Sequence, residues 1–173
     1  MPQRTDVFDL ARLRLTSGEG RRLDLHVAVE PFAFGGQTYA ADPALVAVRL
    51  DVSRTTGNGY ALRLRFEADV AGPCMRCLEP AAPRFAVDAR EVEQPGAVDE
   101  ELSSPYVDSD GELDLAAWAR DALALMLPAQ IICMPDCAGL CPQCGANLNE
   151  DPEHAHEAAP DTRWSKLSEI RFD

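Results

Sequence analysis

The stretch Tyr60-Ala-Leu-Arg-Leu-Arg-Phe-Glu-Ala-Asp-Val-Ala-Gly-Pro-Cys-Met-Arg-Cys77 decides the fold of this chain. From Tyr60 to Val70 apolar and polar residues alternate, and a period of two residues is typical of a β-strand with one buried face. The preceding turn, Thr56-Gly-Asn-Gly59, predicts a hairpin with the alternating run from Val46 to Val52. The sequence therefore predicts a sheet in which a pair of cysteines, Cys74 and Cys77, lies in a loop between strands.

Further elements are predicted on either side of this stretch. The run from Leu23 to Val29 alternates, and another strand begins at Phe85 and ends near Pro95. A helix is expected after Asp114, a suitable N-cap, and before Pro128, which stops it. Its apolar positions, which we expect to pack on the sheet, are Leu115, Ala119, Ala122, Leu123 and Met126. The predicted fold class is α+β, with an antiparallel sheet or small open barrel in the N-terminal half, one helix and a C-terminal zinc-knuckle lobe.

Three regions follow from these elements. Residues 1–95 form a β-rich region that carries the first C-x-x-C loop, residues 96–112 an acidic connection, and residues 113–173 the helix and a Cys/His lobe. Between Glu91 and Asp114 there are nine acidic residues and no basic one. Such a run is usually a solvated connection, or it faces a basic partner. A short helical turn at 165–170 is expected to hold the tail through Trp164 and Leu167.

Composition restricts the setting of this 173-residue chain, whose hydrophobic content of 46% is enough for a core. No N-terminal apolar run resembles a signal peptide, and no apolar stretch approaches the roughly 20 residues of a membrane span. We therefore expect a cytoplasmic protein without a membrane contact, in which paired thiols stay reduced and bind metal.

The net charge of −13 argues against direct binding of nucleic acid along the protein surface, because such binding normally needs a basic face. The scattered arginines are expected on solvated strand faces.

The densest cluster of metal ligands lies near the C-terminus. It reads Cys133-Met-Pro-Asp-Cys-Ala-Gly-Leu-Cys-Pro-Gln-Cys-Gly145, and His154-Ala-His156 follows. Two residues between cysteines let both thiolates leave one tight turn and bind the same ion. Gly145 suits such a knuckle, because its backbone often needs a conformation that only glycine adopts without cost. The sequence therefore predicts bound zinc.

Eight candidate ligands make two sets of four, and structural zinc sites are closed and four-coordinate. The division we favour gives one ion to Cys74, Cys77, Cys133 and Cys137, and a second ion to Cys141, Cys144, His154 and His156. The rival division has a single ion, held by Cys137, Cys141, Cys144 and one histidine. The other three cysteines would then be free.

These ligand sets favour a structural role over catalysis. A catalytic zinc keeps an open coordination position, and a thiolate-rich ion is a poor Lewis acid because its sulfurs already donate charge. The sequence shows no Ser-His-Asp grouping, phosphate loop or dinucleotide fingerprint, so we expect no enzymatic activity. The alternative is a thiol-based redox or zinc-release switch, because Arg76 inside the first turn favours a thiolate.

Several of these motifs together resemble the YceD family. They are Cys74-Met-Arg-Cys-Leu-Glu-Pro80, the helix start Leu113-Asp-Leu115, the helix end Leu127-Pro128 and the run from Cys133 to Asn149. The most specific part is Gly-Leu-Cys-Pro-Gln-Cys-Gly-Ala-Asn-Leu-Asn, and the resemblance covers the chain from about Leu23 to Ile170.

Two motifs depart from the family pattern. The family's Asp-Pro-Arg-Trp is Asp161-Thr-Arg-Trp164 here, and many relatives have a C-x-C pair where His154 and His156 stand. Imidazole can replace thiolate on zinc, so the second departure supports ligation by these histidines.

The resemblance implies a cytoplasmic, non-enzymatic factor needed for accumulation of large-subunit ribosomal RNA and for ribosome assembly. Its expected partner is a ribosomal protein or a pre-ribosomal particle of the large subunit, with direct contact to RNA left open. An acidic surface suits a basic ribosomal protein better than bare RNA.

Overall fold

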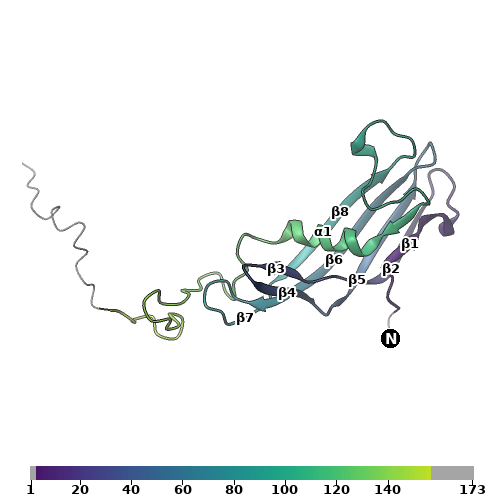
Figure 1. Ribbon diagram of the computed structural model, residues 1–173. Helices are drawn as coiled ribbons and strands as arrows, with labels where there is room; N and C mark the ends of the chain where they lie inside the picture. The colour runs from purple at the N-terminus through teal and green to yellow at the C-terminus, as the bar shows by residue number, and fades with distance from the viewer. Residues whose placement is uncertain (1–2, 157–173) are drawn as a thin grey trace, which may run out of the picture.

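The computed structural model describes residues 3–156, and its fold in this range is α+β, as predicted. An antiparallel sheet is covered on one face by helix α1 (Leu115–Met126), and the C-terminal segment with its cysteines and histidines extends from one end of the sheet (Figure 1). The tail turn expected at 165–170, with Trp164 and Leu167, lies outside the described residues.

Within residues 3–156 the main sheet has seven strands and is organised around β6 (Tyr60–Pro73). Its order is β2-β5-β6-β4-β3, and two further strands, β7 and β8, also pair with β6. The other bounds are β2 (Gly20–Ala28), β3 (Phe32–Phe34), β4 (Gln37–Asp42), β5 (Leu45–Arg54), β7 (Pro80–Ala81) and β8 (Arg84–Glu93). A second, two-stranded sheet pairs β1 (Val7–Asp9) with β9 (Glu112–Asp114), and the short 3-10 helices are η1 (Leu10–Leu13) and η2 (Glu100–Leu102).

β6 is long enough to pair with four strands. From Tyr60 onward it pairs with β5 on one side and β8 on the other, and its last residues pair with β4 and β7. The predicted hairpin between β5 and β6 is present, and Gly57 and Asn58 in its turn have φ angles of 83° and 66°. Because β6 ends at Pro73, Cys74 begins the loop at the end of the central strand.

Tyr39 on β4 packs across this end of β6. Its side chain is 1% exposed, and its hydroxyl donates a hydrogen bond to the carbonyl oxygen of Pro73 at 2.9 Å. A Cβ atom at Gly72 would overlap the Tyr39 ring, so glycine is required for this close approach. Tyr39 therefore fixes the strand end from which the first pair of cysteines projects.

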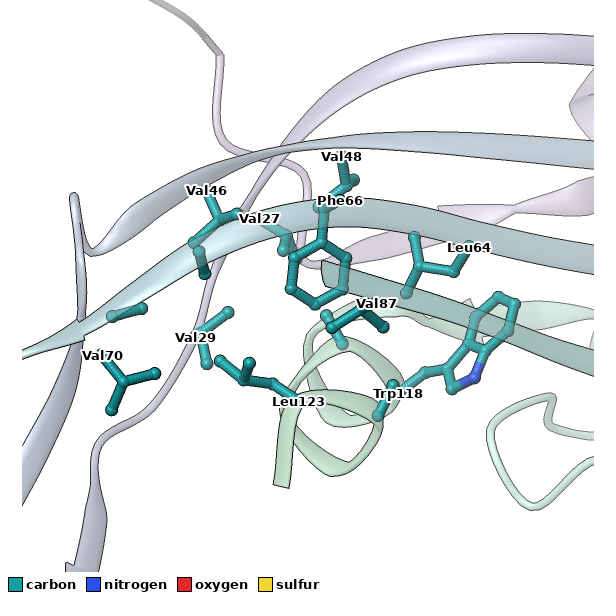
Figure 2. Packing of buried hydrophobic residues seen from close by; sticks show 14 of the residues in the cluster. Val27, Val29, Val46, Val48, Leu64, Phe66, Val70, Val87, Trp118 and Leu123 are labelled. Carbon is teal, nitrogen blue, oxygen red and sulfur yellow. The ribbon is translucent and has the colours of Figure 1, made fainter. Parts of the chain in front are cut away.

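Helix α1 packs its apolar stripe on the sheet. The Asp114 side chain accepts a hydrogen bond from the Ala117 N–H, which confirms the predicted N-cap. Figure 2 shows Trp118 and Leu123 among sheet residues that include Val87. The prediction that Met126 packs on the sheet was wrong, because this residue ends the helix and is 48% exposed. The prediction also missed Trp118, which is 1% exposed.

In the described part of the chain, no helix has the length and apolarity that crossing a bilayer requires.

The acidic segment between β8 and α1 is partly packed and is not only a connection. Its last residues form β9, and Ser104 is buried with its N–H donating to the Glu93 carboxylate at 3.0 Å. The Tyr106 ring stacks on Trp118, with ring centroids 6.2 Å apart. Exposed acids remain on the segment at Asp99, Glu101, Asp108, Asp110 and Glu112.

On the face of the sheet opposite to the buried strand residues, arginine and aspartate side chains of neighbouring strands form ion pairs. Arg22 and Arg65 both contact Asp51, and the hydrogen bond from Arg22 is the main cause that lowers the pKa of this carboxyl. The other pairs are Arg49–Asp24, Arg63–Asp88 and Arg84–Asp69. These strand arginines lie on a solvated face, as expected, and are paired with carboxylates, whereas Arg12, Arg14 and Arg76 lie outside the strands.

We predict that Trp118→Ala lowers the free energy of unfolding by about 3–5 kcal/mol, because it leaves a cavity between α1 and the sheet. Denaturant titration followed by circular dichroism measures this loss. The control Leu125→Ala, at a side chain that is 86% exposed, should stay within about 0.5 kcal/mol of the parent. Equal losses for both variants would show that the helix does not pack as described.

Candidate metal centres

The structure brings the eight predicted ligands together in two groups of four. The first tetrad is Cys74, Cys77, Cys133 and Cys137, and the second tetrad is Cys141, Cys144, His154 and His156. In each tetrad, one ligand atom from every residue lies within 4.8 Å of the other three. The donors are thus grouped as in the division favoured from the sequence, and each group could hold a metal ion.

The first tetrad lies where the β6–β7 loop meets the segment that follows α1. Cys74 and Cys77 come from the loop, and backbone contacts hold the two segments together. The Met75 N–H donates to the carbonyl oxygen of Ile131 at 2.8 Å, and the Ile131 N–H lies 3.3 Å from the Met75 sulfur. Ile131 is 1% exposed, so this junction is part of the core. The path of the chain after the helix therefore carries Cys133 and Cys137 to the first pair.

The sulfur–sulfur distances in the first tetrad fit a shared ion. The Sγ atoms of Cys74 and Cys137 are 3.8 Å apart, and those of Cys77 and Cys133 are 3.6 Å apart. Four sulfurs at about 2.3 Å from a tetrahedral zinc are separated by about 3.8 Å, whereas a disulfide has an S–S length of about 2.05 Å. All six cysteines are free thiols. The donors therefore fit a closed site of four cysteines.

Backbone donors prepare one thiol of this tetrad for metal binding. Burial raises the pKa of Cys74, but hydrogen bonds from the N–H groups of Cys77, Arg76 and Cys133 outweigh this effect and lower the pKa to about 6. Burial and the neighbouring thiols raise the pKa of Cys133 to about 12. One thiolate is therefore available at neutral pH, and a bound cation would displace the remaining protons.

The second tetrad repeats this knuckle geometry around Cys141 and Cys144. Hydrogen bonds from the N–H groups of Gln143 and Cys144 lower the pKa of Cys141 to about 6, as the equivalent groups do for Cys74. The residue after each knuckle is in the left-handed region, with φ 66° at Leu78 and 76° at Gly145. Glycine adopts this conformation freely, whereas for Leu78 it costs about 1–2 kcal/mol.

Both histidines of the second tetrad face its thiols. His154 Nε2 lies 3.2 Å from Cys144 Sγ, and His156 Nε2 lies 3.3 Å from Cys141 Sγ. His154 Nδ1 is 3.6 Å from the Asp151 carboxylate, an arrangement that commonly orients a metal-bound imidazole. These donors fit a site of two cysteines and two histidines. Cys144 and His156 are exposed, whereas three of the four cysteines of the first tetrad are buried.

Each tetrad supplies four protein donors, so a bound ion has no position left for water or substrate. The zinc would neutralise thiolate charge and hold the joined segments together, which is the chemistry of a structural site. The second tetrad depends on the first for its place, because the Leu140 N–H donates to the carbonyl oxygen of Arg76 at 3.2 Å.

Comparisons with known proteins agree with these motifs. The model of the family described as large ribosomal RNA subunit accumulation protein YceD matches residues 62–171, a range that contains all eight ligands. Uncharacterized proteins of Mycobacterium tuberculosis and Mycobacterium bovis are each 36% identical over 163 residues, which is 91% of this chain and 78% of theirs. A Zea mays protein, named large ribosomal RNA subunit accumulation protein YCED homolog 1, chloroplastic, is 41% identical over 51 residues, 30% of this chain and 17% of its own length. No solved structure matches.

We predict about two zinc ions per chain in protein purified without a metal-affinity tag, because each tetrad is a complete four-donor set. Elemental analysis measures this ratio.

Cys141→Ser should lower the ratio of zinc to protein to about one while the far-ultraviolet circular dichroism of the sheet is retained, since metal binding in the C-terminal lobe is local folding free energy. Cys74→Ser should also remove one ion and should loosen the contact between the sheet and the segment after α1. A ratio of about one in the parent protein would reject this division and favour the single-ion alternative.

Proposed function

Because the chain belongs to the YceD family, we propose that it supports accumulation of large-subunit ribosomal RNA by binding an assembly partner in the cytoplasm. The family match is the observation that carries this proposal. It spans most of β6, helix α1 and both tetrads, so it covers the parts of the fold that the metal centres hold together.

The geometry of the tetrads supports a binding role without catalysis. Neither donor set leaves an open coordination position, and zinc held in this way acts as a cross-link. In our proposal, one zinc in each tetrad stabilises the loop at the end of β6 and the C-terminal lobe, which then present a fixed surface to the partner.

The charge of the molecule favours a basic protein, alone or within a pre-ribosomal particle, over bare RNA. The net charge is −13, and several arginines of the sheet face are already paired with aspartates, as with Arg63 and Asp88. The exposed acids on the segment between β8 and α1 suit a basic ribosomal protein. We propose that this segment faces the partner.

Apolar side chains beside the first tetrad form a second candidate surface, at the other end of β6 from the acidic segment. Leu78 and Phe34 are 60% and 39% exposed, and they line a groove of about 560 Å³ together with Tyr39 and Met75. Residues with a strained backbone are concentrated at functional sites, and Leu78 has a φ angle of 66°.

Depletion of the protein in its host cell should lower large-subunit ribosomal RNA and particles while small-subunit RNA is spared, because the proposed partner belongs to the large subunit. Gradient profiles of ribosomal particles and RNA quantification measure this effect. An unchanged profile under strong depletion would remove the proposal.

Complementation of the depleted cells with variants tests the proposed surface. A chain with Glu101→Gln, Asp110→Asn and Glu112→Gln should restore the large subunit less well than the parent, because it loses three charges that attract a basic partner. The matched control neutralises three exposed acids elsewhere, Glu30, Asp42 and Glu67, and should complement fully. Equal complementation by both chains would exclude the acidic segment as the contact.

A second candidate function is a zinc-release switch, and the exposure of Cys144 favours it. Peroxide would take two electrons from the thiolates of Cys141 and Cys144, which join as a disulfide, while the peroxide takes up two protons and leaves as two water molecules. The second tetrad would then lose its ion. Mild peroxide treatment with a zinc-release assay tests this alternative. If no zinc is released at peroxide concentrations that oxidise known thiol sensors, the switch is excluded.

A further inference from the structure

Asn149 connects the lobe of the second tetrad to a ligand of the first. It lies in the chain between Cys144 and His154, yet its side-chain Nδ2 is 3.5 Å from Cys137 Sγ. Its Oδ1 accepts a hydrogen bond from the Ala138 N–H at 2.7 Å. The amide thus contacts both a thiol of the first tetrad and the backbone that follows this thiol.

The hydrogen-bond network fixes the orientation of the Asn149 amide. Nδ2 also donates to Asn147 Oδ1 at 2.9 Å, so both of its protons and the acceptor Oδ1 have partners. If the amide were turned over, Oδ1 would face the Cys137 sulfur and the Asn147 oxygen, and Nδ2 would face the Ala138 N–H. Acceptor would meet acceptor and donor would meet donor, so the donor is directed at the sulfur.

The network continues from Asn149 to the second tetrad. The Asn147 carbonyl oxygen accepts from the N–H groups of Glu150 and Asp151 at 3.1 and 3.2 Å. The Asp151 carbonyl oxygen accepts from the His154 N–H at 3.1 Å, and the Asp151 carboxylate lies beside His154 Nδ1. A continuous set of contacts therefore joins a cysteine of the first tetrad to a histidine of the second.

We propose that Asn149 is a positioning residue that couples the two metal centres. The inference rests on the zinc sites of the proposed function. Four thiolates around a divalent cation leave excess negative charge, and an N–H donor stabilises a thiolate. The segment that carries Asn149 folds around the second ion, so an occupied second tetrad holds this donor against Cys137 and slows loss of zinc from the first tetrad.

The Asn147-Leu-Asn149 stretch carries no metal ligand, and its two asparagines act together. Asn147 accepts from both the backbone N–H and the side-chain amide of Asn149 at 3.1 and 2.9 Å, and so holds it in place. Asn149 supplies the donor. An aspartate at position 149 would keep the shape but replace the donor with a negative charge beside a thiolate.

The first test measures zinc release from the loaded full-length chain to a chromophoric chelator. Cys74→Ser and Cys141→Ser identify which kinetic phase belongs to which tetrad. Asn149→Asp should accelerate zinc release from the first tetrad by about 10- to 100-fold, because losing a group that supports a metal ligand usually lowers metal affinity by that factor. The matched control Asn58→Asp makes the same change in the hairpin turn that precedes β6, and it should release zinc as the parent does. Equal release from Asn149→Asp and the control would overturn the proposal.

The second test asks whether the coupling passes through Asn149. His154→Ala combined with His156→Ala empties the second tetrad and should accelerate zinc release from the first. In an Asn149→Ala background the same histidine changes should add no further acceleration, because the connecting donor is already absent. Full additivity would overturn the coupling. Absence of zinc from the parent chain would instead overturn the metal sites, and the zinc content of each protein distinguishes the two failures.

Discussion

The junction between the end of β6 and the segment after α1 is the constraint on which the rest of the structure depends. The two pairs of the first tetrad are separated by more than 50 residues of chain, and the contacts Cys77–Cys133 and Cys74–Cys137 span 56 and 63 residues. Closing such a loop costs conformational entropy. The buried Met75–Ile131 contact offsets part of this cost, and zinc binding would supply the larger share as folding free energy.

The C-terminal lobe has little core of its own and depends on this junction. Among residues 138–156 only Gly139 and Cys141 are buried, whereas the sheet and helix contain the main apolar cluster. Its place is set by the Leu140–Arg76 contact and by the Asn149 amide against Cys137. The two centres thus form a hierarchy, in which the buried tetrad joins the lobe to the sheet and the exposed tetrad shapes the lobe.

Local sequence patterns were sufficient to predict a strand with one buried face and a helix start that is capped by a neighbouring side chain. The alternation from Tyr60 to Val70 predicted β6 because one face of that strand is buried along its length. Asp114 predicted the helix start because a side-chain oxygen satisfies a free N–H there. The C-x-x-C spacing predicted that Cys74 shares a tetrad with Cys77 and Cys141 with Cys144, because two thiols from one turn can bind the same ion.

Features that depend on distant partners could not be predicted in this way. One local element was also missed: Gly35-Gly36 is a two-residue hairpin signal, but β3 and β4 on either side of it have only three and six residues and show little alternation. β1 pairs with β9 across more than 100 residues, and no local pattern in Val7–Asp9 indicates that pairing. The role of Asn149 was missed for the same reason, because its side chain acts on a ligand of the other tetrad.

X-ray absorption at the zinc edge of the His154→Ala, His156→Ala variant tests the central claim most directly. Our account predicts that the retained ion has about four sulfur neighbours at about 2.3 Å and no nitrogen neighbour, because only the first tetrad remains complete. A retained ion with three or fewer sulfurs, or a variant that holds no zinc, would contradict the claim that Cys74, Cys77, Cys133 and Cys137 form a closed site that joins the sheet to the segment after the helix.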